Sequence, residues 1–570
     1  MSTKFSWEIR PTDSEADFGN ELNRQLPLLV RQLLKQRGIR SPEEAERFLR
    51  PRLADLGDPF EMREMDAAVE RIFRAVDHGE HVCIYGDYDV DGVSSVTLLH
   101  TILTAYGVNP TCFIPVRTKE GYGLSDDGID HALEKCGCTP GLLITVDCGT
   151  SSVDEVAYLN SLGIDVIILD HHESSTQGRP PAVAVVNAKL EHNSPMTYLC
   201  SAGVVFKLAH AMLKRRRLMH FDLKEYLDIV AIATVADIVP LVAENRLLTR
   251  HGLRIMAKGG NIGLQALNEV TGLRSTPNAS HVSFRIGPRL NAAGRMDSPS
   301  DALELLMTSD IQRAQQLAHR LEAHNRARQQ EEEKIRAEAT DMLENSFSPA
   351  NDRVIVLGSR TWHPGVVGIV ASLLMRRYHK PTFIISLDSN GLGKGSGRSI
   401  PGISLVQAIH ECADTLVSGG GHEMAAGLVI REEMIDKFRE AFDTFVLEHA
   451  SEDQLKPKLT IDAEVDFKDL TLDLLDSYEL MEPFGNSNPQ PVFMSRNVML
   501  SDAPRHLQNH LRLSLRQHNY ECDAMYFNGG NIALPDPPWD IAFTIDRNVW
   551  RGRTTLSMSI QDIRPAQPNH

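Results

Sequence analysis

The sequence lacks the features that would tie it to a membrane or to an export route. Its longest apolar run, residues 227–242, is interrupted by Asp228 and Asp237 and is too short and too polar to span a bilayer. The first ten residues, MSTKFSWEIR, contain no apolar core of the kind that a secretory signal needs. These absences predict a protein that stays in the cytoplasm and has no membrane partner.

Cysteine is sparse as well, with eight residues scattered along the 570 of the chain. Only Cys136 and Cys138 lie close together, and no second Cys or His pair follows at the spacing of a zinc finger. We therefore expect reduced thiols in a core, without a disulfide framework.

An excess of positive charge is also missing. The chain has 59 Lys and Arg against 76 Asp and Glu, which gives a net charge of −17 at pH 7. Such a chain as a whole repels phosphate, which argues against indiscriminate coating of nucleic acid. The basic run Lys214-Arg215-Arg216-Arg217 is interpreted first as the solvated end of a helix, favoured by the helix dipole, with a DNA-binding patch as the alternative. A nucleic-acid enzyme with this charge balance must concentrate its cations locally and neutralise its carboxylates with metal.

What the chain does contain is an alternation of helix-like and strand-like patterns, with 42% hydrophobic residues and no internal repeats. This alternation is typical of a mostly parallel sheet covered by helices. The expected strands are 82–85, 111–115, 142–146, 166–169 and 182–186, with helical patterns such as 93–105 and 153–162 between most of them.

Local composition divides the rest of the chain. Residues 1–75 are polar and helical, with a helix-cap signal at Ser41-Pro42-Glu43-Glu44. Residues 310–344 contain no Gly or Pro and predict one long connecting helix. After a second α/β region, a polar stretch at 450–458 leads to a tail with the alternation of strands. The predicted parts are an N-terminal helical extension (1–75), an α/β domain (76–308), a connector helix (309–345), a smaller α/β domain (346–450) and a β-rich domain (459–566).

The strongest local feature is the sequence DYDVDG at 87–92, directly after the expected strand and Gly86. Its three carboxylates lie at two-residue spacing, and a Gly then lets the chain turn into a helix. The same spelling opens a calcium-binding EF-hand loop. That loop needs a Glu at its twelfth position, which is Leu98 here, and a helix in place of the preceding strand. The EF-hand interpretation therefore fails.

Two further strands end in the same way, one in Asp147 and the other in Asp170-His171-His172. Parallel sheets place the carboxyl ends of their strands along one edge, where ligands bind. A further carboxylate, Asp237, lies in an otherwise apolar segment, where a charge is costly unless it is paired or bound to metal. The residues expected in one crevice are Asp89, Asp91, Asp147, His171, His172 and Asp237.

A single Asp at a strand end is commonly a cap or turn residue without further function. Several such residues that converge on one edge repel each other and demand cations, and mixed carboxylate and imidazole ligands suit Mn²⁺ or Mg²⁺. Two ions close enough to share Asp147 would generate a hydroxide near neutral pH and stabilise an in-line displacement at phosphorus. The residues thus predict a two-metal phosphodiesterase.

A glycine-rich segment, residues 393–397, contains Lys394 and Ser396 and is followed by Arg398. It is open to two interpretations. Its glycines could expose backbone N–H groups beside a cation and cradle a phosphate. It could also be an ordinary glycine-rich loop, which composition alone favours.

The chain resembles a known family, the DHH phosphoesterases, and among them the bacterial RecJ exonucleases, over nearly its whole length. The tripeptide DHH alone is weak evidence, but nine motifs in order with matching domain lengths are strong. These motifs are GDYDVDG (86–92), VDCG (146–149), DHH (170–172), TVADIVPL (234–241), FRIGPRLNAAGRM (284–296), WHPGVVGIVAS (362–372), KGSGRSIPG (394–402), GGGHEMAAG (419–427) and PFGNSNPQPVF (483–493).

The resemblance implies a mostly parallel DHH domain, joined by a long helix to a smaller α/β DHHA1 domain, with a C-terminal OB-like β-barrel. It implies that two Mn²⁺ or Mg²⁺ ions are bridged by Asp147, that His172 contacts the scissile phosphate, and that Asp87 orders the loop or binds a metal through water. The implied metal ligands are Asp89, Asp91, Asp147, His171 and Asp237.

The resemblance further implies a pocket in which Ser396 and Arg398 hold a 5′-terminal phosphate. Its implied partners from the first domain are Arg117 and either Arg295 or Arg289. His422 is expected to approach the same cleft, with a structural turn histidine as the alternative.

The activity implied by the resemblance is 5′-to-3′ hydrolysis of single-stranded DNA to mononucleotides, in DNA repair and recombination. The alternatives are a DHH-family oligoribonuclease or cyclic-dinucleotide phosphodiesterase, and a non-catalytic DNA-binding scaffold. The tail beyond residue 458 argues against the first alternative and the intact acidic motifs against the second. The expected partners are single-stranded DNA, single-strand-binding protein and a RecQ-type helicase, with the chain as a monomer. In the tail, a basic cluster of Arg547, Arg551 and Arg553 beside Trp550 suits backbone tracking and base stacking.

Overall fold

The computed structural model describes residues 5–11, 17–116, 120–121, 123–174, 178–190, 194, 196–273, 276–296, 298–348, 352–550 and 552–567. The chain forms two compact units. Unit 1 comprises Met1–Ala45, Arg328–Leu480 and Gln490–His570. Unit 2 comprises Glu46–Ala327 and Met481–Pro489.

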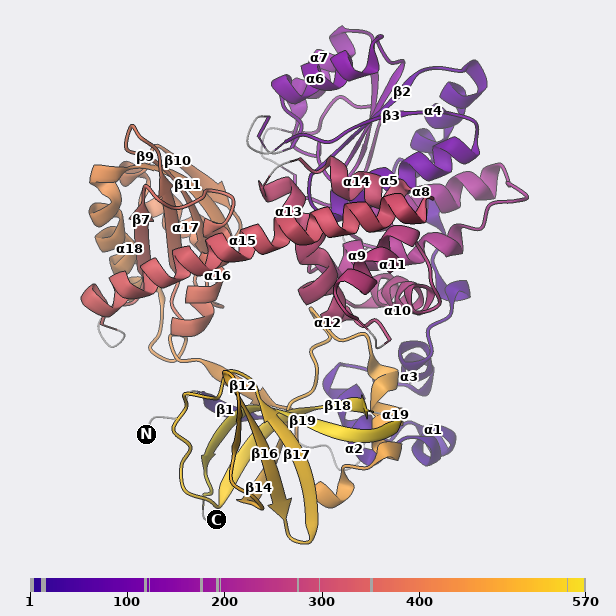
Figure 1. Cartoon of the computed structure of the whole chain (residues 1–570). Helices are drawn as coiled ribbons and strands as arrows, with labels where there is room; N and C mark the ends of the chain where they lie inside the picture. The colour runs from indigo at the N-terminus through magenta and orange to yellow at the C-terminus, as the bar shows by residue number, and fades with distance from the viewer. Residues whose placement is uncertain are drawn as a thin grey trace. The chain divides into compact units, whose positions relative to one another are not determined.

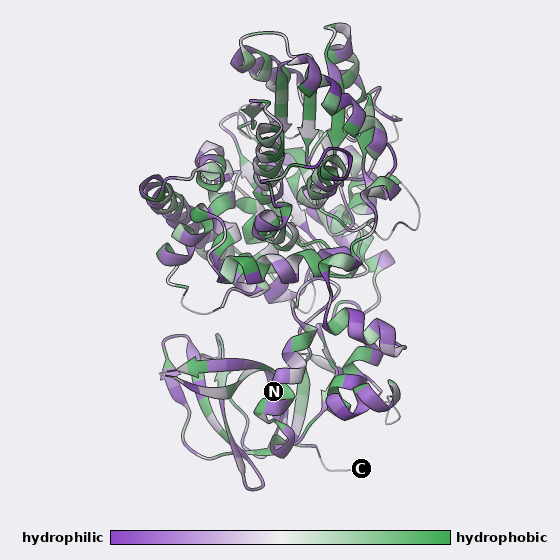
Figure 2. Ribbon diagram, turned by 90° about the vertical axis from the view of Figure 1, so that its right-hand side faces the viewer, coloured by the Kyte–Doolittle hydropathy of each residue, from purple (hydrophilic) through white to green (hydrophobic). Residues whose placement is uncertain are grey.

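Unit 2 contains a five-stranded sheet in which every pairing is parallel, in the order β3-β2-β4-β5-β6. Each predicted strand is present, and its ends differ from the prediction by no more than two residues. Figure 2 shows these strands as hydrophobic, as expected for a sheet that is covered on both faces. The strands are β2 (Val82–Gly86), β3 (Thr111–Phe113), β4 (Leu142–Val146), β5 (Asp165–Leu169) and β6 (Ala184–Val186).

Helices cover both faces of this sheet. Apolar residues of α4 (Met65–His78), α5 (Val90–Ala105) and α8 (Ser201–Arg215) form one core with it. Residues of α6 (Asp126–Cys136) and α7 (Val153–Ser161) form a second core on the other face. The parallel α/β prediction is confirmed.

The remaining helices of unit 2 share a further core with part of α5, and α9 and α10 also contribute to the first core. They are α9 (Leu227–Ala236), α10 (Ala243–Ala257), α11 (Ile262–Val270), α12 (Ala279–His281), a π-helical turn (Val282–Ile286), α13 (Gly287–Met296) and α14 (Ser300–Met307). The predicted connector is one continuous helix, α15 (Ile311–Ser346), which belongs to both units (Figure 1). Among the described residues, no helix combines the length and the apolar character needed to cross a bilayer.

Unit 1 contains a second sheet, in the order β10-β11-β9-β8-β7. α17 (Leu405–Glu411) and α18 (Ile435–His449) share a core with it, while α16 (Val367–Tyr378) packs against β8 and β9. The strands are β7 (Ile355–Ser359), β8 (Thr382–Leu387), β9 (Leu392–Arg398), β10 (Ser418–Gly421) and β11 (Ala425–Arg431).

The glycine-rich segment is a strand, and both loop interpretations of it are wrong. Residues 392–398 form β9, which is paired with β8 on one side and β11 on the other. Its backbone N–H groups are therefore used in the sheet and cannot cradle a phosphate. The glycines face the core instead: a Cβ atom on Gly397 would overlap the ring of Phe383, and one on Gly395 would lie 2.6 Å from Leu428. Close packing, not loop flexibility, explains why these positions are glycine.

The tail of unit 1 forms a barrel. Its strands are ordered β13-β14-β18-β19-β17-β16-β15, and a further pairing of β14 with β16 closes the ring. The predicted OB-like barrel is thereby confirmed. The strands are β13 (Ala463–Glu464), β14 (Phe493–Leu500), β15 (Arg505–Leu507), β16 (His510–Gln517), β17 (Tyr520–Tyr526), β18 (Trp539–Trp550) and β19 (Arg553–Pro565), with the short helix α19 (Leu472–Tyr478) beside them.

The N-terminal segment is not entirely helical. It begins with β1 (Ser6–Ile9), which pairs in parallel with β12 (Lys458–Ile461), a partner too distant for local sequence patterns to indicate. The helices α1 (Gly19–Gln25), α2 (Leu28–Gln36) and α3 (Pro42–Leu49) follow. The predicted helix start is confirmed, because the Ser41 hydroxyl accepts the Glu44 N–H at 3.1 Å and the Glu44 carboxylate accepts the Ser41 N–H at 3.1 Å.

Candidate metal centre and phosphate site

The first acidic loop joins β2 to α5 and positions two carboxylates. Asp89 caps α5, because its carboxylate accepts the N–H groups of Asp91 at 2.9 Å and Gly92 at 3.1 Å. Gly92 must lack a side chain, since a Cβ atom there would overlap the backbone of Asp87. The loop is thus held in one shape by its own acidic residues.

Asp91 is buried and points at the start of α8. Its two carboxylate oxygens accept the N–H groups of Ser201 at 2.7 Å and Ala202 at 2.8 Å. These are N–H groups of the first helical turn, which have no partner within the helix. Burial and the charge of Asp89 nevertheless raise the pKa of Asp91 to about 6.

Asp147 follows β4 and is the most constrained of the carboxylates. Its φ of 63° lies in the left-handed region, which is uncommon for residues other than glycine and is often found at functional sites. The Ser201 hydroxyl donates a hydrogen bond to its Oδ1 atom at 2.9 Å. Burial, and then the charges of Asp91 and the other nearby carboxylates, raise the pKa of Asp147 well above its usual range.

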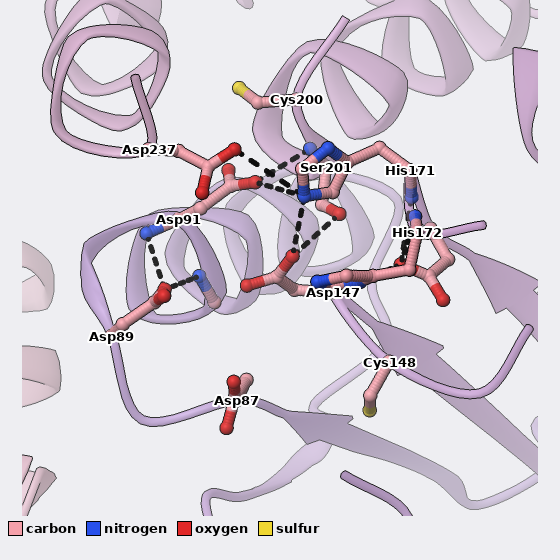
Figure 3. A network of polar contacts seen from close by, with 12 residues as sticks. Asp87, Asp89, Asp91, Asp147, Cys148, His171, His172, Cys200, Ser201 and Asp237 are labelled. Atoms are coloured by element: carbon pink, nitrogen blue, oxygen red, sulfur yellow. Dashed lines mark hydrogen bonds and ion pairs between the residues drawn. The ribbon is translucent and has the colours of Figure 1, made fainter. Parts of the chain in front are cut away.

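His171 follows β5 and lies among three carboxylates (Figure 3). Its Nε2 atom is 3.3 Å from Asp147 Oδ1, 3.4 Å from Asp237 Oδ2 and 3.7 Å from Asp91 Oδ2. Burial lowers the pKa of His171 to about 3, so the ring is neutral. Neither ring nitrogen has a hydrogen-bond partner among the described residues. Burial and the charges of Asp91 and Asp89 also raise the pKa of Asp237 to about 8.

His172 has the opposite electrostatic character. Burial opposes its protonation, but the hydrogen bond to Asp170 and the surrounding carboxylate charges outweigh burial and raise the pKa of His172 to about 9. Its Nδ1 atom lies 2.8 Å from Asp170 Oδ1. Asp170 also accepts the N–H groups of His171 at 2.7 Å and Thr150 at 3.0 Å. A cationic imidazole is therefore fixed beside the acidic cluster.

The donor set fits divalent cations. The ligand atoms form three groups, each within 4.8 Å: Asp91, His171 and Asp237; Asp87, Asp89 and Asp147; and Asp147, His171 and His172. The carboxylates repel each other, and the neutral imidazole of His171 has no hydrogen bond. A bound cation would relieve this repulsion and give the imidazole a partner. The nearby thiols of Cys148 and Cys200 have pKa values raised by burial and by neighbouring carboxylates, so oxygen and nitrogen atoms are the available ligands.

The structure thus brings together the six residues that the sequence placed in one crevice, with Asp87 beside them, and Asp147 belongs to two of the three groups. Two further residues, Asp170 and Ser201, hold this cluster and are not among the candidates that the sequence indicates. Asp170 could have been found from its place in the strand-end tripeptide. Ser201 carries no local signal, because its contact with Asp147 depends on the fold.

Ser396 and Arg398 lie together on β9. Nη1 of Arg398 donates to the Ser396 hydroxyl at 3.1 Å and to the carbonyl of Gly397 at 2.7 Å. Both side chains face the first turn of α16, since a Cβ atom on Gly368 would lie 2.8 Å from Ser396 Oγ and 3.3 Å from Arg398 Nη2. The N-terminal turn of a helix favours anions. A serine, an arginine and a helix start are therefore combined at one point.

His422 lies in the turn between β10 and β11 and is exposed. Its N–H donates to the carbonyl of Ala425 at 2.8 Å, and Ala425 is the register partner of Arg398. The turn therefore places His422 near the end of β9 that carries Arg398. This position is compatible with both interpretations of the histidine.

The predicted arginine partners differ in their surroundings. Arg289 Nε lies 2.6 Å from a carboxylate oxygen of Glu322, so its charge is already neutralised. Arg295 is half-buried further along the same helix, α13. Arg117 lies outside the described residues.

Two basic clusters singled out from the sequence differ in how far carboxylates engage them. In the run 214–217, Lys214 pairs with Asp58 at 2.8 Å and Arg216 with Asp77 at 2.6 Å, and Arg215 pairs with Asp66. This supports the solvated helix end. In the barrel, Arg547 pairs with Glu479 at 2.8 Å and with Asp476, and Arg553 is exposed. Arg551 and the side chain of Trp550 lie outside the described residues.

Family models match three segments of the chain. They are the DHH family, N-terminal domain, at residues 81–234, the DHHA1 domain at residues 351–448 and the RecJ OB domain at residues 461–562. With the parallel sheet and its acidic edge, they define the class of the protein as a DHH-type protein with a DHHA1 domain and an OB barrel.

Curated relatives narrow this class. The single-stranded-DNA-specific exonuclease RecJ of Bacillus subtilis is 35% identical, over 99% of this chain and 71% of its own length. The RecJ exonuclease of Salmonella typhimurium is 34% identical, over 97% of this chain and 98% of its own. A crystal structure of RecJ from Thermus thermophilus in complex with Mn²⁺ superposes with a TM-score of 0.83 at 28% identity, covering 99% of this chain and 80% of that one. The chain belongs to the RecJ family.

Proposed function

We propose that this chain is a metal-dependent exodeoxyribonuclease that hydrolyses single-stranded DNA from the 5′ end and releases 5′-mononucleotides, in DNA repair and recombination. The observation that carries the proposal is the meeting of five carboxylates and two histidines at the sheet edge. The substrate follows from the relatives, which are named single-stranded-DNA-specific exonucleases. The intact acidic cluster argues against a non-catalytic scaffold.

Two divalent cations, Mn²⁺ or Mg²⁺, would be held by the acidic cluster, as RecJ of Thermus thermophilus has been solved with either metal. One would be bound by Asp91, His171 and Asp237, and the other by Asp87 and Asp89, with Asp147 shared. When bound, such a pair supplies an activated water and stabilises charge at phosphorus. Asp87, whose role the sequence leaves open, is thus proposed as a metal ligand.

The other residues of the centre orient these groups. Asp170 would hold His172 as a cation directed at the scissile phosphate, where it stabilises developing negative charge. Ser201 would keep Asp147 in place through its hydroxyl, and the start of α8 would do the same for Asp91.

The 5′-terminal phosphate would be bound by Ser396, Arg398 and the first turn of α16. The forked guanidinium and the helix N–H groups supply directed donors for a dianion. We propose Arg295, Arg117 and His422 as further contacts, and give Arg289 a lesser role because of its pairing with Glu322.

The barrel at 459–566 would bind the single strand. The proposed domains are those predicted above, with 1–75 as an N-terminal extension, 76–308 as the DHH domain, 309–345 as the connector and 346–450 as the DHHA1 domain. We further propose that the protein is a monomer in the cytoplasm and acts with single-strand-binding protein and a RecQ-type helicase.

The test uses purified full-length protein, Mn²⁺ and one DNA strand labelled at either end. A 5′ label should appear at once in mononucleotides, whereas a 3′ label should pass through a ladder of shortening products. Duplex DNA and the Asp147→Asn variant serve as controls and should show little release. Absence of cleavage in saturating Mn²⁺, or mononucleotide release from the 3′ label first, would overturn the proposal.

A further inference from the structure

A short segment of the C-terminal region belongs to the unit that carries the metal centre. Residues Met481–Pro489, here named the strap, are part of unit 2, although the chain on both sides of them belongs to unit 1. The strap contains most of the motif PFGNSNPQPVF, which the proposed function leaves without a role.

The strap is a closed loop anchored on α10. Arg246 Nη2 and Arg250 Nη1 each donate to the carbonyl of Glu482 at 2.8 Å. Within the strap, the Asn488 amide donates to the carbonyls of Met481 at 3.0 Å and Pro483 at 2.8 Å. These bonds give the strap a defined shape and a defined place on unit 2.

One strap residue, Asn486, bridges the loop that follows Asp237. Its side-chain Nδ2 atom donates to the carbonyl of Ile238 at 2.6 Å, and its main-chain carbonyl accepts the N–H of Leu241 at 2.8 Å. The approach is close, because a Cβ atom on the neighbouring Gly485 would lie 2.7 Å from Leu241. Both ends of the loop 238–241 are therefore fixed by a single residue.

The loop 238–241 contains a strained residue and therefore needs contacts that stabilise it. Ile238 has a φ of 59°, which is a genuine outlier for a β-branched residue and persists only when the surroundings impose it. Packing of its side chain does not provide this, since Ile238 is 69% exposed. The hydrogen bond from Asn486 to the Ile238 carbonyl acts on the strained residue itself.

The strained residue, Ile238, directly follows Asp237, and the orientation of the Asp237 side chain depends on the backbone. Asp237 Oδ2 is buried, lies 3.4 Å from His171 Nε2 and has no hydrogen-bond partner among the described residues. Asp91 and Asp147, in contrast, are each held by hydrogen bonds to their carboxylates. The position of the Asp237 carboxylate is therefore set by the main chain around residues 237 and 238.

We propose that Asn486 is a positioning residue of the metal centre, which fixes the 238–241 loop and thereby the carboxylate of Asp237. The strap then sets the affinity of the centre for its divalent cation. This inference rests on the proposed role of Asp237 as a metal ligand. Substitutions of residues that orient metal ligands typically lower metal affinity by roughly 10- to 100-fold.

The experiment is a calorimetric titration of the full-length protein with Mn²⁺ in the absence of DNA. Asn486→Ala should weaken binding of one ion by about tenfold, at the lower end of that range because Asn486 acts through the backbone. The near-isosteric Asn486→Leu should do the same, since it also removes the side-chain donor, and it serves if the alanine variant does not fold. Asn548→Ala, an exposed residue of β18 in the same tail, is the matched control and should bind as the wild type does.

A second substitution tests the role of strain. Asparagine tolerates the left-handed conformation better than isoleucine, so Ile238→Asn in the Asn486→Ala background should recover part of the lost affinity. If both Asn486 variants lower the melting temperature of the metal-free protein but bind Mn²⁺ like the wild type, Asn486 is only a structural residue and the inference is wrong.

Asp237→Asn separates this outcome from a failure of the proposed function. If Asp237→Asn binds Mn²⁺ as tightly as the wild type, the metal assignment itself fails. If it loses one ion while both Asn486 variants keep it, only the role of Asn486 fails.

Discussion

The proposed metal centre and the proposed phosphate site use strands in different ways. In unit 2 most of the proposed metal ligands follow the ends of β2, β4 and β5, where the backbone leaves the sheet and can adopt strained shapes such as that of Asp147. In unit 1 Ser396 and Arg398 belong to β9 itself, whose backbone is paired on both sides up to Arg398. A loop that follows a strand therefore contributes backbone geometry to a site, whereas a paired strand contributes only the side chains of one face.

The largest effect is expected at the strand end of β4. Asp147→Asn preserves the shape and tolerates the left-handed backbone, but it removes the charge shared by the two proposed ions. The rate of single-strand hydrolysis in saturating Mn²⁺ should fall below a few per cent of wild type. Asp130→Asn, an exposed position on α6, is the matched control. Substantial remaining turnover would mean that Asp147 is not the bridging ligand.

A strong pH dependence should accompany the same centre. The pKa values of Asp91 and Asp237, raised to about 6 and about 8, mean that protons compete with the cation, so Mn²⁺ affinity should rise as the pH increases across this range. In the metal-free protein the sign is reversed. Because these pKa values are higher in the folded state, stability should decline as the pH rises toward 8.

Calorimetry of Mn²⁺ binding and melting curves of the metal-free protein, both taken across this pH range, check the two signs. Asp237→Asn should remove the upper part of both dependences. A Mn²⁺ affinity that stays constant between pH 6 and pH 8 would contradict the raised pKa values.

Within β9, Arg398→Ala should selectively remove the preference for 5′-phosphorylated ends. The loss of a charge-assisted contact costs roughly 1.5–3 kcal/mol, or about ten- to a hundred-fold in rate or affinity. Initial rates on matched 5′-phosphate and 5′-hydroxyl strands measure the effect, with Arg431→Ala, an exposed residue of β11, as the control. An equal loss on both strands would make Arg398 a general backbone contact.

The glycines of the same strand should behave differently. Gly397→Ala forces a methyl group against Phe383 and should destabilise the protein by roughly 1–3 kcal/mol without changing the end preference of the folded enzyme. Denaturant unfolding and the paired-strand assay distinguish the two effects. A loss of end preference in this variant would restore a direct role for the backbone of β9 in phosphate binding.

The smallest effect is expected in the barrel. Arg547 is engaged by Glu479 and Asp476, so Arg547→Ala should change affinity for long single strands by about twofold at most. Arg553→Ala removes an exposed cation and should weaken binding more at low salt than at high salt. Equal losses in the two variants would show that the ion pairs of Arg547 open on DNA.

Features that depend on local sequence patterns could be predicted, whereas features that depend on contacts between distant segments could not. Asp89, Asp147 and His171 could be placed together because each directly follows a recognisable strand and parallel strands share an edge. The contact of Ser201 with Asp147 could not be predicted, because it depends on how α8 packs. The glycines of β9 favour a loop when the sequence is taken alone, because they are required by Phe383 and Leu428, which lie on other strands.

The pairing of β1 with β12 has a consequence for the synthesis of the chain. Ser6 leaves the ribosome before its partner Lys458, which is translated only after all of unit 2 except the strap. Trp7 likewise waits for Asp562, which accepts its indole N–H at 2.8 Å, and for Arg564, which lies over its ring at 4.0 Å. Strand β1 must therefore stay unpaired until β12 has been translated, and the barrel can close only after β19 has been translated.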